Sequence, residues 1–462
     1  MRMLGYRAVD EIVRHLTTLR DRPVGGPSDR RELERLFTAP APENPTPAPE
    51  VLDEVVDQVL TAIVHTDHPR FMAYVPGPSN YVGAIADFLA AGFNVFAGHW
   101  LVGAGPAVVE RVTVDWLRAL CGLPDCAGGL FVSGGTMASL VAVHAARTDR
   151  LSGPDPRGVI YVTAQTHASI RKGLSFLGMA DRQVRAVPVD GRYRMDPAAL
   201  RASVLCDRDS GLRPFCVVAT AGTTSTGASD PLPDIADVCR EDGLWLHVDA
   251  AYGAAAVLTG KARRAMEGLS RADSIALDPH KWWFQPYEAG CVLVREAGTL
   301  SRAYALHAEY LRETRLSDGP LNYYDWGPQL TRSFRALKVW MSLRTFGLNA
   351  FQSAVEHGLV LAEHAQATLS ARKQWEIVTP AQLGIITFRP HAPRLAPGQV
   401  DSLTRAIAAR SLEDGYALVL TTELATRPVL RLCTIHPETT RDDVTAVIDR
   451  LEQLGPTDGT WP

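Results

Sequence analysis

The sequence lacks an excess of charge of either sign. Its 47 lysines and arginines are balanced by 51 aspartates and glutamates, so the formal net charge is only −4. Binding to nucleic acid or to an anionic membrane through counterion release needs a clustered basic face. Pairs such as Arg30 and Arg31 are too short to form one. We therefore expect no nucleic-acid partner and no membrane partner.

Cysteine is scarce and follows no motif. The chain has seven cysteines, an odd number, and no two of them stand in CxxC spacing. This argues against a disulfide framework and against a zinc site, and it suits reduced thiols. The first residues do not resemble a signal peptide, because Val9, Ile12, Val13 and Leu16 recur at helical spacing among charged residues. We expect a cytoplasmic protein without a bound metal.

Long uncharged runs are few. The run 88–109 has the length of about 20 residues that a membrane span needs. This run contains Asn94, His99 and Pro106 as well as several glycines. We predict that it is buried between subunits and not in a bilayer.

The pattern of the chain predicts an α/β fold. Residues 1–37 indicate an amphipathic helix, and five prolines between positions 38 and 49 indicate a stiff linker after it. From about residue 110, helical patterns alternate with short apolar runs at 129–133, 159–162, 215–219, 244–248, 274–277 and 291–294. This alternation predicts a central sheet of about seven strands that is mostly parallel, with helices on both faces.

The last third of the chain has a different pattern. A helical region near 330–370 precedes strand-like segments at 384–388, 417–420 and 429–434 and amphipathic stretches at 400–413 and 440–454. This order predicts a small C-terminal α+β domain. We therefore divide the chain of 462 residues into an N-terminal helical arm with its linker (1–75), a large domain (76–350) and a small domain (351–462).

Lys281 carries the strongest chemical signal. It follows the apolar segment 274–277 and precedes Trp282, Trp283 and Phe284. These neighbours predict a desolvated lysine at a strand end, and desolvation lowers the pKa of an ammonium toward the neutral amine that forms imines. A solvated surface lysine is the ordinary alternative, which the aromatic neighbours disfavour.

Asp249 ends another apolar segment, 244–248. Because ligands of open α/β sheets gather at the carboxyl ends of the strands, we expect Asp249 and Lys281 in one crevice. Pyridoxal 5'-phosphate (PLP) needs a lysine for its Schiff base and a carboxylate that keeps its pyridine nitrogen protonated. The two residues together therefore predict a PLP site.

Polar residues follow three further predicted strands. Gly134, Gly135 and Thr136 open a helix, where glycines let the backbone approach a phosphate and the helix N-terminus supplies amide donors. Thr224 and His167 stand at two other strand ends. Alone, each of these residues would have an ordinary role in a turn, so the assignment depends on their occurring together.

In this order, the motifs resemble those of the group II PLP-dependent decarboxylases, which include aromatic L-amino acid and glutamate decarboxylases. Matching segments cover nearly the whole chain, at 68–74, 115–117, 133–138, 167, 219–225, 247–252, 279–282 and 326–340. The resemblance implies the fold-type I PLP architecture and conversion of an L-amino acid to its amine and CO2. It also implies a homodimer with active sites at the subunit interface, and an aromatic amino acid is a candidate substrate.

The resemblance also assigns roles to residues. It makes Lys281 the Schiff-base lysine, Asp249 the partner of the pyridine nitrogen and His167 the histidine that stacks on the ring. Tyr310, on a mobile loop, becomes the proton donor to Cα after CO2 leaves. The other implied contacts to the cofactor come from Gly134, Gly135, Thr136, Thr224, Ala251 and His280. The implied contacts to the substrate come from Tyr74, Pro76, Thr331 and Arg431, the last through the α-carboxylate or else as a cap of the small domain.

Three positions depart from the family pattern. Asp278 stands where animal members commonly have an asparagine that donates to the phosphate, and a carboxylate there repels a dianion unless it is turned away or protonated. Val75 and Gly98 stand where the animal enzymes have phenylalanines in the substrate pocket. Losing two rings removes stacking and apolar contact, so the sequence does not name the amino acid.

Other functions remain open. An aldehyde synthase on the same fold couples decarboxylation to oxidative deamination, but known switches to that reaction replace the residue matching Tyr310 or His167. A PLP aminotransferase or lyase would be recognised by transfer of the amino group to a keto acid. A PLP-bound regulatory module would need a DNA-binding or partner domain, for which the N-terminal arm is too short and insufficiently basic.

Overall fold

The chain forms two compact units. The computed structural model describes residues 1–305 and 321–456. The first unit takes in Met1–Pro76, Glu363–Pro380 and Thr387–Pro462, and the second takes in Gly77–Ala362 and Ala381–Ile386. The predicted boundaries after residues 75 and 350 stay predictions.

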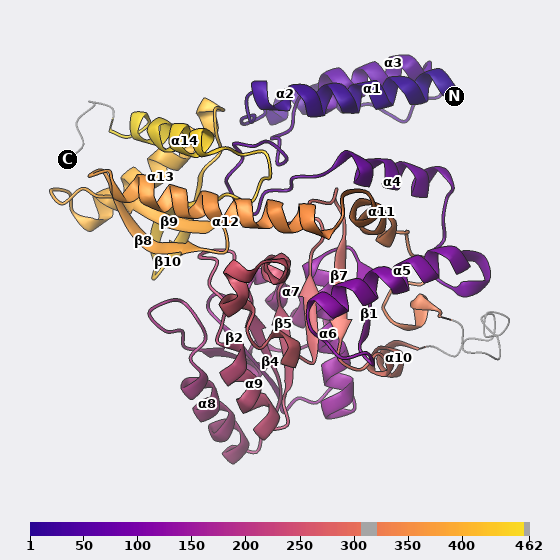
Figure 1. Cartoon of the computed structure of the whole chain (residues 1–462), viewed down its shortest axis with the longest axis vertical. Helices are drawn as coiled ribbons and strands as arrows, with labels where there is room; N and C mark the ends of the chain where they lie inside the picture. Colours follow the sequence, from indigo (N-terminus) through magenta and orange to yellow (C-terminus); the bar gives the residue numbers. More distant parts are fainter. Residues whose placement is uncertain (306–320, 457–462) are drawn as a thin grey trace. The chain divides into compact units, whose positions relative to one another are not determined.

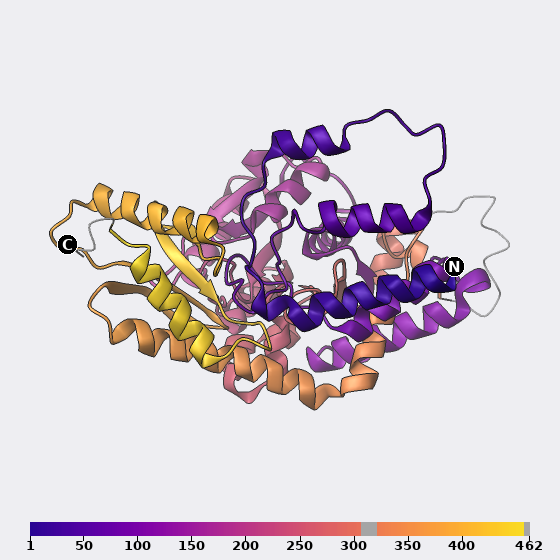
Figure 2. The same ribbon diagram turned by 90° about the horizontal axis from the view of Figure 1, so that it is seen from above.

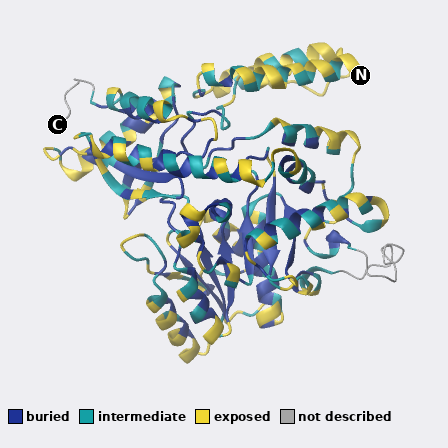
Figure 3. Ribbon diagram, viewed as in Figure 1, coloured by how far each residue is buried: buried dark blue, intermediate teal, exposed yellow. Residues whose placement is uncertain are grey.

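A seven-stranded sheet lies at the centre of the second unit (Figure 1). Its spatial order is β1-β7-β6-β5-β4-β2-β3, and of these strands β7 alone runs antiparallel to its neighbours. The strands are β1 (Gly128–Val132), β2 (Gly158–Thr163), β3 (Val184–Val187), β4 (Arg213–Thr220), β5 (Trp245–Asp249), β6 (Ser274–Leu277) and β7 (Gly290–Val294). Five of them, β1, β2, β5, β6 and β7, are buried along their whole length (Figure 3). Such burial is typical of a parallel sheet covered on both faces, and the predicted central sheet is confirmed.

Helices from four crossover connections cover the sheet. The connections through α6 (Gly135–Leu151) and α7 (Ala168–Phe176) lead from β1 to β2 and on to the edge strand β3. Those through α8 (Pro197–Asp209) and α9 (Leu232–Glu241) lead back to β4 and β5. Because such crossovers are right-handed, the two pairs lie on opposite faces of the sheet. The unit also contains α4 (Tyr81–Gly92), α5 (Trp100–Leu120), α10 (Gly298–Tyr304), α11 (Ala336–Phe346) and most of α12 (Leu348–Ser370).

The first unit holds most of a four-stranded sheet with the order β10-β11-β9-β8. Figure 2 shows α13 (Pro397–Asp414) and α14 (Arg441–Gln453) beside its strands. The strands are β8 (Trp375–Gln382), β9 (Ile385–Pro390), β10 (Leu420–Leu424) and β11 (Arg427–Cys433). The N-terminal helices α1 (Arg2–Thr18), α2 (Arg30–Phe37) and α3 (Ala48–Glu54) belong to the same unit. The predicted C-terminal α+β region and N-terminal helical arm are therefore present.

The single helix predicted over 1–37 is interrupted. After α1, Val24 is buried and extended, its N–H donating to the carbonyl of Gly415 (2.8 Å) and its carbonyl accepting from the N–H of His65 (2.8 Å). Pro23 precedes it, and Gly25 has φ +107°, a conformation that favours glycine. These residues end the helix because their backbone groups pair with distant segments of the chain.

Two strands were not predicted and one was misplaced. The unpredicted strands are β3 and β8, and the predicted strand 417–420 overlaps β10 only at Leu420. Its apolar residues are buried for another reason, because Leu418 forms a parallel bridge with Phe71.

The uncharged run 88–109 forms the end of α4, a turn and the start of α5. Within α5, Gly103 has non-helical angles (φ −138°, ψ 41°) and Pro106 follows it. None of the helices in the described ranges combines the length and the apolar character needed to cross a bilayer. Several apolar side chains of the run are exposed in the single chain: Phe88, Phe93, Leu101 and Val102.

Candidate functional site

A cavity of about 220 Å³ lies at the carboxyl edge of the central sheet. Segments that follow β1, β2, β4, β5 and β6 line it. The lining residues are Gly134, Gly135, Thr136, Gln165, His167, Ser169, Thr220, Gly222, Thr224, Asp249, Ala251, Tyr252, Asp278, His280 and Lys281. The structure therefore brings together every residue that the sequence predicted to contact PLP.

Asp249 and Lys281 reach the cavity from neighbouring strands. Asp249 is the last residue of β5, where it pairs in register with Ala276 of the parallel strand β6. Burial raises the pKa of the Asp249 carboxyl, while the Lys281 ammonium and the N–H of Ala251, which donates to Oδ1 (3.1 Å), oppose this rise. The groups beside this buried carboxyl, above all the Lys281 ammonium, therefore decide whether it is protonated.

Lys281 has a direct ionic partner. Its Nζ lies 2.9 Å from Oδ2 of Asp278, which is buried. Burial acts to lower the pKa of Lys281, but Asp278 and then Asp249 outweigh it, so the pKa lies above its usual value. The expectation of a lowered pKa was therefore wrong, because it left out Asp278.

The predicted aromatic surroundings of Lys281 are present. Trp282, Trp283 and Phe284 are all buried. Trp282 stacks on Tyr252, with ring centroids 5.1 Å apart and planes inclined by 6°. This packing fixes the turn that carries Lys281.

The start of α6 forms a cradle for an anion. No side chain caps this helix of 17 residues, so its first amides remain available to a ligand. A Cβ on Gly135 would lie 2.9 Å from Cβ of Ala251 and 3.0 Å from Oδ2 of Asp278. A side chain there would fill the space in which a phosphate can approach the backbone. The amine, the buried carboxylate and this cradle fit PLP.

His167 is the N-cap of α7 and lines the same cavity. Its Nδ1 lies 2.7 Å from Oγ of Ser169 and accepts from the N–H of Ser169 (3.3 Å). Acceptance at Nδ1 places the ring proton on Nε2 in the neutral imidazole. His167 therefore presents an N–H donor as well as an aromatic face.

The predicted substrate residues are divided between the units. Tyr74, Pro76 and Arg431 belong to the first unit and Thr331 to the second. Arg431 is buried and its Nη1 donates to the carbonyl of Tyr74, whereas Nε and Nη2 are buried without a hydrogen-bond partner among the described residues. Tyr74 and Thr331 are exposed and Pro76 is buried. Tyr310 lies outside the described residues.

Sequence reasoning did not assign several residues of the lining. Their shared feature is that each stands close to a predicted residue in the same strand-end segment. They are Gln165, Ser169, Thr220, Gly222 and Tyr252. A search of whole strand-end segments, instead of single motif positions, would have found them.

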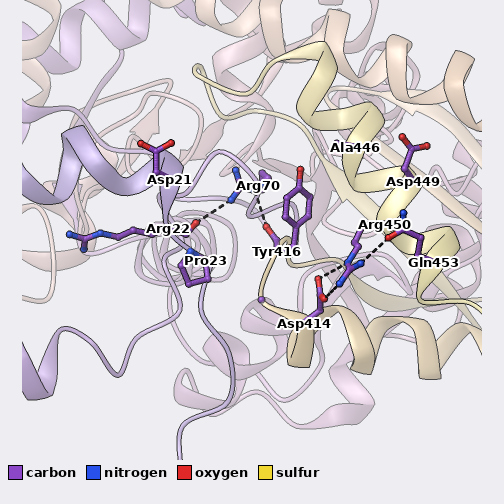
Figure 4. Close-up of a pocket in the computed structure, with 11 residues that line it drawn as sticks. Asp21, Arg22, Pro23, Arg70, Asp414, Tyr416, Ala446, Asp449, Arg450 and Gln453 are labelled. Atoms are coloured by element: carbon purple, nitrogen blue, oxygen red, sulfur yellow. Dashed lines mark hydrogen bonds and ion pairs between the residues drawn. The ribbon is translucent and has the colours of Figure 1, made fainter.

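A larger cavity, of about 700 Å³, lies within the first unit (Figure 4). Arg70 in its wall already donates to the carbonyls of Arg20, Arg22 and Tyr416. Arg450 is paired with Asp414, and the side chain of Arg22 points away from the other labelled residues (Figure 4). Arg70 and Arg450 are bonded to other groups of the unit, and Arg22 points elsewhere. The lining of this cavity does not contain the amine and buried carboxylate that meet in the sheet-edge site.

One cluster of possible metal ligands also lies in the first unit. It consists of His15, His65 and Asp67, whose ligand atoms lie within 4.8 Å of one another. Nε2 of His15 and Oδ2 of Asp67 are hydrogen-bonded directly at 2.9 Å. The absence of a metal stays a prediction.

The chain is similar to known proteins over most of its length. A family model described as the pyridoxal-dependent decarboxylase conserved domain matches residues 30–391. An aromatic-L-amino-acid decarboxylase of Bacillus atrophaeus is 43% identical over 456 residues, which are 98% of this chain and 95% of that protein. A phenylacetaldehyde synthase of Arabidopsis thaliana is 30% identical over 402 residues, covering 84% of this chain and 82% of that protein.

Solved structures give the same answer for the fold. The crystal structure of Oryza sativa TDC with PLP and tryptamine matches with a TM-score of 0.92 and 27% identity, covering 98% of this chain and 97% of that one. The predicted fold-type I architecture and the predicted PLP cofactor are thereby confirmed. The protein is a PLP-dependent enzyme that removes the carboxyl group of an L-amino acid. With a family match over most of its length and a relative 43% identical along nearly all of it, the chain belongs to the pyridoxal-dependent decarboxylases.

Proposed function

We propose that this decarboxylase converts an aromatic L-amino acid to the corresponding amine and CO2, with Lys281 as the residue that holds PLP. The observation that carries the proposal is the meeting of Lys281, Asp249 and the uncapped start of α6 in one cavity. The names of the relatives support an aromatic substrate, because one is an aromatic-L-amino-acid decarboxylase and a matching structure was solved with tryptamine.

Each group of the cavity has a distinct part in holding the cofactor. Bound PLP supplies a ring that accepts the electron pair left at Cα when CO2 departs. Lys281 would attach the cofactor through its amine, and Asp249, whose charge is little screened because it is buried, would keep the ring nitrogen protonated. The amides of Gly135 and Thr136 would hold the phosphate, and His167 would offer its Nε2–H within the same cavity.

Arg431 is proposed to bind the α-carboxylate of the substrate. Two of its donor nitrogens are buried without a partner among the described residues, and leaving charged donors unpaired costs free energy. A carboxylate accepts two parallel N–H bonds from a guanidinium and would satisfy both. Its bond to the carbonyl of Tyr74 would hold the guanidinium in place meanwhile.

Phe96 is proposed to supply part of the aromatic surface that Gly98 and Val75 do not. A Cβ on Gly98 would overlap the ring of Phe96 and would lie 2.8 Å from the carbonyl of Leu330, next to Thr331. The ring of Phe96 meets the ring of His99 edge to face, with centroids 5.3 Å apart. Aromatic rings so arranged favour another aromatic ring as a neighbour.

The product depends on what reaches Cα after CO2 has left. A proton gives the amine, whereas the relative named phenylacetaldehyde synthase is named for an aldehyde product. We keep Tyr310 as the proposed proton donor on the strength of the resemblance, although it lies outside the described residues. His167, which lines the cavity, is the second group that the resemblance ties to amine formation.

A homodimer is proposed as the working form. The exposed apolar side chains of Phe88 and Phe93 on and after α4, and of Leu101 and Val102 at the start of α5, support it. A partner that covered these side chains would stabilise the assembly by about 25 cal/mol for each Å² of apolar surface removed from water. A second copy of the chain would bury them, as the sequence predicted for the run 88–109.

The cytoplasm is the proposed location. The seven cysteines all lie in the described ranges, and none forms a disulfide. Cysteines that form no disulfide suit a reducing compartment.

The test is a screen of the purified, PLP-loaded enzyme against the twenty amino acids, with CO2 and amine measured together. We expect equal amounts of both from tryptophan, tyrosine or phenylalanine and little from the acidic amino acids. The Lys281→Ala variant serves as the blank. Release of CO2 from glutamate or aspartate alone would overturn the aromatic assignment. Transfer of the amino group to a keto acid without CO2 would overturn the decarboxylase assignment.

A further inference from the structure

Asp278 is a buried acidic group for which the roles assigned above give no use. It follows β6 and lines the cavity, and its side chain is almost fully enclosed. Its Oδ2 pairs with Nζ of Lys281 at 2.9 Å and lies 3.6 Å from Nε2 of His280. Its Oδ1 is buried and has no hydrogen-bond partner among the described residues. One oxygen of this carboxyl is thus available to a ligand.

Among the groups around Asp278, Lys281 is the cation that pairs with it directly. Lys281 and His280 come from its own turn, and burial lowers the pKa of His280, so that histidine is neutral near pH 7. From the neighbouring strands, Asp249 on β5 is a second carboxyl near Asp278, whereas burial raises the pKa of the Cys291 thiol on β7, which therefore stays neutral. Tyr287 and Lys338 act on Lys281 and on His280 respectively. Lys281 therefore carries most of the compensation for a charged Asp278.

Cofactor binding changes both the negative charge near Asp278 and the position of the Lys281 nitrogen that compensates it. A Cβ on Gly135 would stand 3.0 Å from Oδ2 of Asp278, so a phosphate held by the first amides of α6 lies beside this carboxyl. A phosphate monoester carries a charge of about −1.5 to −2 at pH 7. At the same time the nitrogen of Lys281 joins the cofactor aldehyde with loss of one water, and its orientation is then set by the cofactor ring. A charged Asp278 would then repel the phosphate.

We propose that Asp278 holds a proton when PLP is bound, and that in this neutral form its O–H donates a hydrogen bond to the phosphate. The proposal rests on Lys281 and the start of α6 holding PLP as described above. For each cofactor bound, the carboxylate takes one proton from solution, and no bond of the phosphate is made or broken. Asp278 is thus a cofactor-binding residue whose protonation makes PLP binding sensitive to pH.

The test compares proton uptake in the wild type and in Asp278→Asn, whose amide mimics the neutral acid and cannot titrate. Apoenzyme is titrated with PLP by calorimetry in two buffers of different ionisation enthalpy, between pH 7.5 and pH 8.5. The titration of PLP itself is common to both proteins, but Asp278 raises the pKa of Lys281, so the variant also changes the titration of that lysine. Pyridoxal, which joins the same lysine, measures this contribution in each protein. After it is subtracted, we expect the wild type to take up one proton more than the variant, and the ratio of the wild-type Kd to the variant Kd should rise about tenfold per pH unit.

Pyridoxal, which has no phosphate, is the matched probe. Its binding to the wild type and to Asp278→Asn measures how the titration of Lys281 differs between the two proteins, and it also shows that the variant is folded. If the variant does not fold, the wild type alone still decides, because PLP should then take up one proton more than pyridoxal in the same pH range. Above pH 7.5 the phosphate of free PLP is already a dianion and does not account for that proton.

The assignment of the site and the role of Asp278 would be refuted by different results. PLP that neither binds nor becomes fixed to Lys281 by borohydride would refute the assignment of the site. PLP that binds and is fixed, but with equal proton uptake in the wild type and in Asp278→Asn after the uptake seen with pyridoxal is subtracted, would overturn the proposal for Asp278 alone. An Asp278→Asn protein that bound PLP no more tightly than the wild type at pH 8.5 would overturn it as well.

Discussion

Asp249 and Lys281 enter one cavity from the carboxyl ends of two adjacent parallel strands. Asp249 is paired in register with Ala276, so β6 runs only one residue further before the turn that carries Lys281. Parallel neighbours end at the same edge of a sheet, which places a carboxylate and an amine together although they stand far apart in the sequence. The arrangement makes separate predictions for the two residues.

Lys281→Ala should lose both CO2 release and the linkage to PLP that borohydride reduces. The amine that holds the cofactor is then gone, and the other lysines and arginines of the described chain do not line this cavity. The measurement is mass spectrometry of the borohydride-treated protein. The control is Lys172→Ala, at an exposed position of α7. A reduced PLP adduct on the Lys281→Ala protein would show that another lysine holds the cofactor.

Asp249→Asn should retain PLP but release CO2 several orders of magnitude more slowly. The amide keeps the size of the side chain and removes the negative charge that keeps the ring nitrogen of PLP protonated. Single-turnover rates and the visible spectrum of bound PLP measure the two effects separately. Asp209→Asn at the exposed end of α8 is the control. A rate within tenfold of the wild type, about 1.4 kcal/mol in the barrier, is incompatible with the role given to Asp249.

Arg332 should matter for stability through a buried ion pair. Its Nη2 donates to Oε1 of Glu110 (2.5 Å) and to the carbonyl of Phe131 (2.8 Å), and both charged side chains are buried. Arg332→Met leaves Glu110 charged without its partner, so we expect a loss of about 3–5 kcal/mol in the free energy of unfolding. Urea unfolding of the PLP-loaded enzyme measures it.

The matched control for this pair is exposed. Arg240 pairs with Asp237 on the surface of α9, and Arg240→Ala should cost less than about 1 kcal/mol. Adding Glu110→Gln to Arg332→Met should restore part of the loss, because it removes the unpaired charge. Equal costs for Arg332→Met and Arg240→Ala would show that burial does not set the strength of these pairs.

Leu101→Asp should weaken self-association. A charge placed among the exposed apolar residues that include Phe93 and Val102 cannot be buried against a second copy without a large desolvation cost. Sedimentation of the PLP-loaded enzyme at several concentrations reports the monomer fraction, which we expect to rise at least tenfold. Leu205→Asp, at an equally exposed apolar residue of α8, should leave it unchanged. A dimer of unaltered strength would place the subunit interface elsewhere.

The sequence was sufficient for the central sheet except for its edge strand β3. Strands such as β5 and β6 are apolar along their whole length because both faces are covered, and that pattern is visible without a structure. The edge strand β3 contains Arg185 and is only partly buried, so its four residues resemble a loop. The apolar residues before Leu420 misled the prediction because Leu418 is buried by pairing with Phe71, which is distant in the sequence.

The same limit applies to the cavity. Residue types at strand ends predicted its lining, since the topology of the sheet alone brings those ends together. The ion pair between Asp278 and Lys281 depends on how a turn folds back, with the N–H of Lys281 donating to the carbonyl of Asp278 (3.0 Å). Likewise the unpartnered donors of Arg431 follow from burial by residues far along the chain. The first relationship needs the conformation of a turn, which the residue types alone do not set, and the second needs contacts with distant parts of the chain.

His436 should make the first unit less stable in acid. It is buried, the N–H of Glu438 donates to its Nδ1 (3.1 Å), and its Nε2 therefore carries the proton and donates to the carbonyl of Asp67 (2.8 Å). A second proton on the ring would displace Glu438. Burial lowers the pKa of His436 from 6.5 to about 4, so the folded chain keeps this histidine neutral where the unfolded chain protonates it.

The sign of the effect follows from proton counting. Between pH 6.5 and pH 4 the unfolded state binds more protons at His436, so the free energy of unfolding falls as the pH falls through this window. The loss from His436 should reach about 2 kcal/mol at pH 5. Urea unfolding of the PLP-loaded enzyme at pH 7, 6 and 5 measures it. His436→Gln should be less stable at pH 7 but should lose less on acidification, whereas His391→Gln at an exposed position should behave as the wild type does. Because many groups titrate over this range, the decisive quantity is the difference in slope between His436→Gln and the wild type. Identical slopes would mean that His436 is protonated equally in the folded and unfolded chains, so that burial does not lower its pKa.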